Sequence, residues 1–214
     1  MCLKACKDSM ISCRPFIGLD GCFLKHKYRG EILIVVGRDA NDQMLPIACV
    51  IVEVENKDTW TWFLELLIDD LGRPDICAAY TFMSDQQKGL LPAIQSLQSL
   101  LPRADQRFCM RHLYANFKKK FPGKNLKALM WEAAHSTYPQ QWEKVMKRMK
   151  EVNNDAFKHM LGIPPRYWSK SRFISRPLCD TLVNNMSEAF NSIIVQARSK
   201  PIMSMMEEIC LYMM

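Results

Sequence analysis

Three carboxylates lie in or beside apolar segments of this 214-residue chain, where ionised groups are poorly tolerated. Asp20 interrupts the strand-like run 16–24, Asp85 ends the apolar run 80–85, and Glu188 lies within residues 184–191. A carboxylate in apolar surroundings carries a desolvation cost unless a cation or hydrogen bonds compensate it. Three such groups from distant parts of the chain predict one site for a hard divalent cation, of the kind that binds Mg²⁺ and acts on phosphates.

The composition predicts an ordinary globular protein, because 49% of the residues are hydrophobic and 24% are charged. The length favours one domain, or one domain with an inserted subdomain. No apolar stretch approaches the roughly 20 residues of a membrane span, so we expect no membrane partner. The first residues lack the apolar core of a signal peptide, which argues against secretion. The nine Cys, without any Cys-x-x-Cys pair, are therefore expected to be reduced thiols of the cytosol or nucleus.

Positive charge is concentrated in the middle of the chain. Residues 103–176 hold 17 of the 29 Lys and Arg but 5 of the 22 Asp and Glu, so a basic segment lies within an acidic frame. This segment is either a solvated helical surface or a track for a phosphate backbone beside an acidic metal site. The candidate DNA contacts are Lys118, Lys119, Lys120, Lys124 and Arg172.

Five segments read as strands. Residues 16–24, 31–36 and 44–54 are rich in Ile, Val, Leu and Phe, and their short links favour an antiparallel meander. A fourth strand is predicted over about 76–83 and a short fifth strand over 107–109.

Helices are predicted between and after the later strands. Apolar residues from Trp60 to Leu71 follow helical spacing, and Asp58 or Thr59 is the predicted cap. Another amphipathic helix is predicted over 90–101. Residues 110–167 read as mainly helical with breaks at 122–123 and 164–165, and 185–214 as helical apart from an interruption at Pro201.

This order of elements matches an α/β fold with an RNase H-like mixed sheet and flanking helices. In that fold one carboxylate lies on the first strand, another at the end of the fourth, and a third on a late helix, as do Asp20, Asp85 and Glu188. The roughly 100 residues between the last two imply an inserted all-helical subdomain. We therefore predict a first core part at 1–109, a basic helical insertion at 110–175, and a C-terminal helical segment at 176–214 that returns the third carboxylate.

Five ordered blocks of the sequence resemble the catalytic domain of plant Mutator-like (MULE) transposases. The fourth block contains Cys109 and His112, which look like the Cys-x-x-His signature of that family. The fifth contains Glu188 and looks like its final carboxylate block. The blocks are residues 18–25, 55–63, 84–90, 107–117 and 179–191.

The resemblance implies a DDE-type transposase that cleaves and transfers DNA strands with two Mg²⁺ or Mn²⁺ ions held by an acidic triad. In this chain the triad would be Asp20, Asp85 and Glu188, with Asp20 bridging both metals. The implied partners are DNA and further copies of the chain, and the implied location is the nucleus.

Alternatives remain open at the level of the whole chain. Members of the family usually carry a zinc-binding DNA-recognition module before this domain and a zinc knuckle after it. Neither module can be recognised in this sequence, so we expect a transposase fragment that lacks them. The alternatives are a domesticated, catalytically inactive relative that binds DNA or regulates transcription, and a relic without molecular function.

Each candidate site residue also has a structural interpretation. Asp20 could form a turn, Asp85 could cap a helix, and Glu188 could be an ordinary surface residue. Cys109 and His112 lie one helical turn apart and could form either a metal pair or a structural thiol–imidazole contact. Zinc normally needs two further ligands, and spacing places none.

Overall fold

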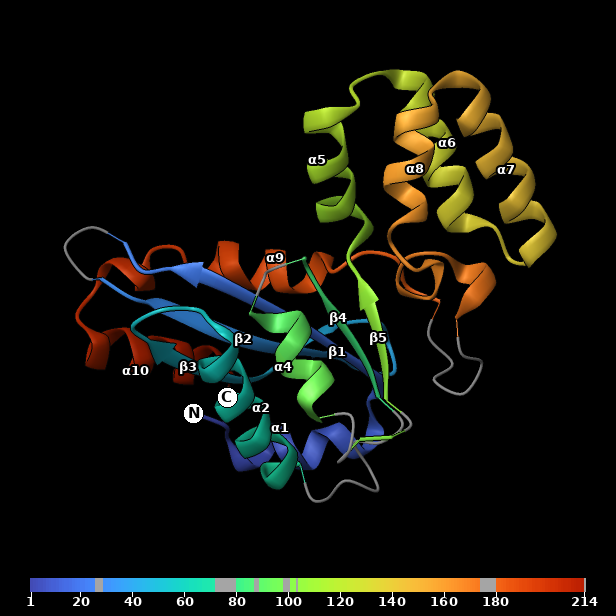
Figure 1. Cartoon of the computed structure of the whole chain (residues 1–214). Helices are drawn as coiled ribbons and strands as arrows, with labels where there is room; N and C mark the ends of the chain where they lie inside the picture. Colours follow the sequence, from blue (N-terminus) through green and yellow to red (C-terminus); the bar gives the residue numbers. More distant parts are fainter. Residues whose placement is uncertain are drawn as a thin grey trace.

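The computed structural model describes residues 1–25, 29–71, 80–86, 89–97, 101–102, 104–173 and 180–213. Its centre is a five-stranded mixed sheet in the order β3-β2-β1-β4-β5 (Figure 1). The neighbours β1, β2 and β3 pair antiparallel, whereas β4 and β5 run parallel to β1. The predicted α/β class with a mixed sheet is confirmed. The strands are β1 Arg14–Phe23, β2 Glu31–Arg38, β3 Met44–Val52, β4 Thr81–Ser84 and β5 Asp105–Phe108.

Both faces of the sheet are covered by helices, as alternation along β2 illustrates. Leu33 and Val35 belong to the core under α2 (Lys57–Asp70) and α4 (Leu90–Ser96). Ile32 and Ile34 face the opposite core, which α9 and α10 complete. Successive side chains of a strand point to opposite faces, so a strand covered on both sides is apolar throughout. The bounds of the later helices are Asn185–Ile193 for α9 and Ile202–Met213 for α10, and the short α1 spans Lys4–Ser9.

Four further helices follow β5 and have a core of their own. They are α5 Met110–Lys120, α6 Lys124–His135, α7 Pro139–Val152 and α8 Asn154–Leu161. Their buried residues form one cluster, in which Trp142 and Trp168 are in ring contact. Figure 1 shows this group standing beyond β5, away from the helices that cover the sheet. Within the described ranges, no helix is both long and apolar enough to cross a membrane.

The predicted cap of α2 was wrong. The cap of α2 is Asn56 and not Asp58 or Thr59: its side chain accepts a hydrogen bond from the Thr59 backbone N–H at 2.9 Å, and the Thr59 hydroxyl accepts one from the Asn56 N–H at 3.0 Å. The helix thus begins one turn before its apolar face does. The predicted strand over 76–83 is described only from Thr81 onwards, because residues 72–79 lie outside the described residues.

The last helical segment breaks earlier than Pro201. Helix α9 ends at Ile193, and a turn and a short 3-10 helix precede α10. Arg198 fixes this break, because its guanidinium donates to the backbone carbonyls of Phe23 and Asn191, both at 3.2 Å. A long-range contact of this kind leaves no trace in helical periodicity.

Helix α9 lies very close to β1 at Gly18. The buried Asn184 side chain donates from Nδ2 to the Leu19 carbonyl at 3.2 Å and accepts from the Ser187 hydroxyl at 2.9 Å. A Cβ at Gly18 would lie 2.3 Å from Asn184 Oδ1 and 2.8 Å from Ser187 Oγ. Glycine at position 18 therefore permits the contact that seats the start of α9 on the sheet.

We predict that Gly18→Ala lowers the free energy of unfolding by about 1–3 kcal/mol, because overpacking forces α9 away from β1. Urea denaturation measures the change. Gly162→Ala is the matched control, since its Cβ would meet nothing closer than 3.4 Å, and it should change stability by less than about 0.5 kcal/mol. Equal stability of both variants would contradict the close approach at Gly18.

Candidate active site

The register of the parallel strands brings three chemically reactive residues to one edge of the sheet. Gly18 pairs with Met83, so Asp20 and Asp85 each lie two residues beyond the same rung of the ladder. The last rung between β4 and β5 joins the residues directly before Asp85 and Cys109. Parallel strands end at the same edge, and this edge therefore carries two carboxylates and a thiol.

Asp20 is held in a partly buried, negatively charged environment. Its Oδ2 accepts a hydrogen bond from Asn191 Nδ2 of α9 at 2.7 Å. Burial, and then repulsion from the charge of Asp85, raises the pKa of Asp20 to about 6, and Glu188 adds to this repulsion while His112 opposes it. The site thus disfavours a full set of ionised carboxylates in the absence of a cation.

Glu55, which follows β3, is a fourth carboxylate of this region and was not among the predicted site residues. Its Oε1 accepts a hydrogen bond from Trp60 Nε1 at 2.8 Å. Burial is the main cause that raises the pKa of Glu55 to about 7, and the charges of Asp85 and Asp20 contribute. A Cβ at Gly21 would lie 2.5 Å from Glu55 Oε2, so Gly21 makes room for this carboxylate beside Asp20. The sequence signal that could have identified Glu55 was its position directly after the third predicted strand, 44–54.

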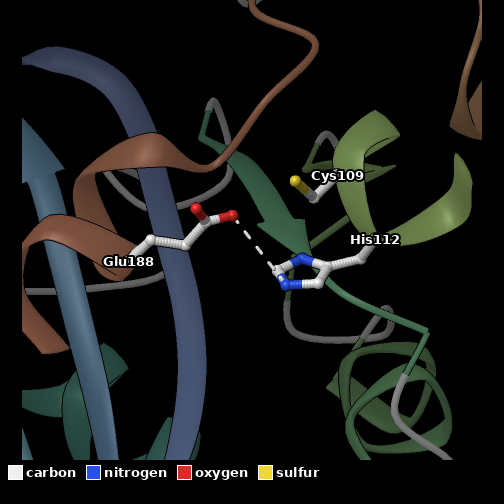
Figure 2. A group of neighbouring side chains, drawn as sticks. All are labelled: Cys109, His112 and Glu188. Atoms are coloured by element: carbon white, nitrogen blue, oxygen red, sulfur yellow. Dashed lines mark ion pairs between the residues drawn. The ribbon is translucent and has the colours of Figure 1, made fainter. Parts of the chain in front are cut away.

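Glu188 lies in the first turn of α9 and faces residues of α5. Its Oε2 forms an ion pair with Arg111 Nη1, and its Oε1 lies 3.9 Å from His112 Nε2. Figure 2 shows the carboxylate directed at the imidazole. The two helices are far apart in sequence, so this meeting is a product of the tertiary fold.

Cys109 and His112 interact at the start of α5. Cys109 is buried, and its Sγ accepts a hydrogen bond from the Asn184 backbone N–H at 3.2 Å. Burial alone would raise the pKa of the thiol, but the imidazole of His112 and the Asn184 N–H outweigh it, and the pKa of Cys109 is lowered. The Cys109 thiol in turn raises the pKa of His112 to about 9. The pair is therefore biased towards a thiolate and an imidazolium.

The charges of the three predicted metal-binding carboxylates interact at Asp20, but a different group of three has its ligand atoms close together. Asp20 experiences the charges of both Asp85 and Glu188. Among the described residues, the group of three whose ligand atoms all lie within 4.8 Å of one another is Cys109, His112 and Glu188. Glu188 thus lies between the strand-end carboxylates and the thiol–imidazole pair.

A hollow of about 360 Å³ opens beside Asp85. One face of α5 contributes side chains at helical spacing to it, and one of these, Lys119, is among the candidate DNA contacts. Its lining is Asp85, Gln86, His112, Ala115, Asn116 and Lys119.

The other basic candidates lie elsewhere on the surface. Lys118 and Lys120 are exposed in the last turn of α5, and Lys124 is exposed at the start of α6. Arg172 is exposed and forms an ion pair with Glu143 at 3.4 Å. Of the five candidates, Lys119 is the one that the structure places against the strand-end site.

Comparison with known proteins gives one family. Residues 16–116 match the family model of the MULE transposase domain, which confirms the resemblance over a little under half of the chain and does not bear on a plant origin. None of the curated proteins matches the sequence. A solved structure, a simian T-cell lymphotropic virus intasome in complex with PP2A regulatory subunit B56 gamma, is similar at 12% identity and a TM-score of 0.32, over 67% of this chain and 45% of that chain. The chain thus spans less than half of that protein, and so distant a likeness carries no argument here.

The raised pKa of Glu55 predicts a pH-dependent effect of Glu55→Gln in metal-free protein. The folded carboxyl keeps its proton up to about pH 7, against an ordinary value of 4.5, so the folded state binds more protons between these values and stability falls as pH rises. Gln keeps an acceptor for Trp60 but cannot ionise. The stability of Glu55→Gln relative to wild type should therefore increase from pH 5 to pH 8.

Urea denaturation with EDTA across this pH range measures the difference. Glu53→Gln is the control, because Glu53 is an exposed side chain two residues away. A difference between Glu55→Gln and wild type that stays constant with pH would contradict the burial of an ionisable Glu55.

Proposed function

Since residues 16–116 match the MULE transposase domain, we propose that this chain is a DDE-type transposase domain that cleaves and transfers DNA strands in a metal-dependent reaction. Asp20, Asp85 and Glu188 are its proposed catalytic and metal-binding residues. The observation that carries the proposal is the common strand edge at which Asp20 and Asp85 lie, together with the effect of the Glu188 charge, on α9, upon Asp20. Asp20 and Asp85 lie inside the matched residues, whereas Glu188 lies beyond them.

The same proposal extends to the fold. A sheet ordered β3-β2-β1-β4-β5, with three antiparallel strands followed by two parallel ones, supports an RNase H-like core. The separate core of α5–α8 supports an all-helical subdomain at 110–175, inserted between a first core part at 1–109 and a returning segment at 176–214. Functional residues of this subdomain then lie at the start of α5, directly after β5.

The donor set fits Mg²⁺ or Mn²⁺, because hard divalent cations prefer carboxylate oxygens. The pKa of Asp20 is raised by burial and by the neighbouring carboxylates, a repulsion that a bound cation would offset. When bound, two such ions supply activation of a water or DNA 3′-hydroxyl and stabilisation of the leaving oxygen. Asp20, Asp85 and Glu188 would hold them.

Other residues of the chain orient this set and receive the substrate. Asn191 holds Oδ2 of Asp20 by a hydrogen bond at 2.7 Å, and Arg111 pairs with Glu188. Lys119 lines the hollow beside Asp85, where its ammonium group can pair with a backbone phosphate of DNA. DNA as partner, self-assembly and a nuclear location belong to this proposal.

A catalytically idle DNA-binding relative is the second candidate function. The ion pair of Glu188 with Arg111 favours it, because a carboxylate neutralised by arginine is a weaker metal ligand. In that case DNA binding would persist without any response to metal ions. The following experiment separates the two candidates.

We predict that Mn²⁺ at about 100 times its Kd raises the Tm of the wild-type chain by roughly 5–10 °C, because a ligand that binds only the folded state stabilises it. Asp20→Asn should abolish this shift. It should also reduce nicking of supercoiled DNA at least about 100-fold, because the variant loses charge stabilisation at the reacting phosphate.

Asp69→Asn, an exposed change at the end of α2, is the control and should keep the full shift. Thermal unfolding followed by circular dichroism gives the readout. A cooperative transition of the wild-type chain whose Tm does not change with Mn²⁺ would overturn the catalytic proposal. The catalytically idle DNA-binding relative would then be the remaining candidate.

We predict that Lys119→Gln weakens binding to a mixed-sequence DNA duplex and reduces the salt dependence of the affinity by about one unit of slope, as expected for the loss of one phosphate contact. Fluorescence anisotropy at several salt concentrations measures this. Lys118→Gln removes the same charge from another face of α5 and should leave the slope nearly unchanged. Equal slopes for the two variants would refute the placement of DNA at this hollow.

A further inference from the structure

A second kind of metal site overlaps the strand-end carboxylates. Cys109, His112 and Glu188 offer a sulfur, a nitrogen and an oxygen, all within 4.8 Å of one another (Figure 2). This mixed set differs from the all-oxygen set of the proposed catalytic site. Thiolate and imidazole ligands favour zinc-like ions, whereas Mg²⁺ and Mn²⁺ favour oxygen.

The sulfur is already fixed in position. The Cys109 backbone N–H donates to the Ser84 carbonyl at 2.8 Å, which extends the β4–β5 ladder by one step. The buried Sγ accepts a hydrogen bond from the Asn184 backbone N–H at 3.2 Å. Hydrogen bonds of this kind orient metal ligands and stabilise a thiolate. Asn184 also precedes α9, so the same segment positions both Cys109 Sγ and Glu188.

The oxygen and the nitrogen face each other across a gap. Glu188 Oε2 is engaged by Arg111, but Oε1 is shielded from solvent and accepts no hydrogen bond from the described residues. Oε1 lies 3.9 Å from His112 Nε2, which is too long for a hydrogen bond. Zinc binds carboxylate oxygen and imidazole nitrogen at about 2.0–2.2 Å, so an ion between these two atoms would reach both.

We propose that Cys109, His112 and Glu188 bind a zinc-like divalent cation. Three protein ligands leave a fourth position for water or a substrate oxygen. On binding, one proton passes from the thiol–imidazole pair to solvent, which leaves a thiolate and a neutral imidazole as ligands.

The site has a regulatory consequence that, unlike the zinc site itself, rests on the proposed function. Glu188 is common to the mixed set and to the carboxylate triad. A zinc-like ion bound with Cys109 and His112 would occupy Oε1 of Glu188, the oxygen that Arg111 leaves free for the triad. Zinc would therefore inhibit a reaction that Mg²⁺ or Mn²⁺ supports.

The test uses the purified full chain with Co²⁺ as a spectroscopic probe and Zn²⁺ in competition with a chromophoric chelator. The wild-type chain should bind one Co²⁺ with a thiolate-to-cobalt charge-transfer band and release it to Zn²⁺. Cys109→Ser should lose the band and weaken Zn²⁺ binding at least about 100-fold. Cys13→Ser, a change at a partly exposed thiol in another region, should behave as wild type.

His112→Gln is a second ligand variant at a half-exposed position, where folding does not depend on a buried side chain, and it should also weaken Zn²⁺ binding strongly. Asp20→Asn should keep the cobalt band, which separates this site from the carboxylate triad. Retention of the band in Cys109→Ser, or Zn²⁺ affinity unchanged in both ligand variants, would overturn the zinc site. Absence of Mn²⁺ stabilisation together with an intact cobalt band would overturn the proposed function alone.

Discussion

The seating of α9 on β1 is the contact on which the candidate site depends. A buried amide, Asn184, joins the Leu19 carbonyl to the Ser187 hydroxyl directly above Gly18. Buried polar groups of this kind are costly unless they are fully hydrogen-bonded, so they favour one packing arrangement over others. From this point α9 runs past Asp20, which receives a hydrogen bond from Asn191, about two helical turns after Asn184. Loss of the contact between Asn184 and β1 would separate Glu188 from the strand ends.

The sheet supplies the rest of the site through its parallel half. Register places Asp20, Asp85 and Cys109 at one edge. The pKa values of Asp20 and Glu55 rise to about 6 and about 7, whereas that of Cys109 falls. Perturbed groups that converge on one edge are typical of functional sites. At this edge the ionised form of the buried carboxylates is disfavoured, and a hollow lies beside Asp85. Such an arrangement suits cations and phosphates.

Glu188 connects two ligand sets of different chemistry. On one side it adds to the negative charge around Asp20, and on the other it faces His112 and pairs with Arg111. Because Arg111 engages Oε2, the two sites would compete for the other carboxylate oxygen, Oε1. If both proposals hold, competition between two classes of metal ion follows from the geometry of a single side chain.

The order of the elements, the mixed α/β class and the residue types that carry the chemistry could be predicted from the sequence, because strand alternation, helical periodicity and carboxylates in apolar segments are local patterns. The Asn56 cap, the early end of α9 and the position of Glu55 could not, because they arise from a side-chain capping interaction, from Arg198 and from the space left by Gly21. Which groups meet depends on the tertiary structure. Register and helix packing act between segments far apart along the chain, and spacing within a segment carries no information about them.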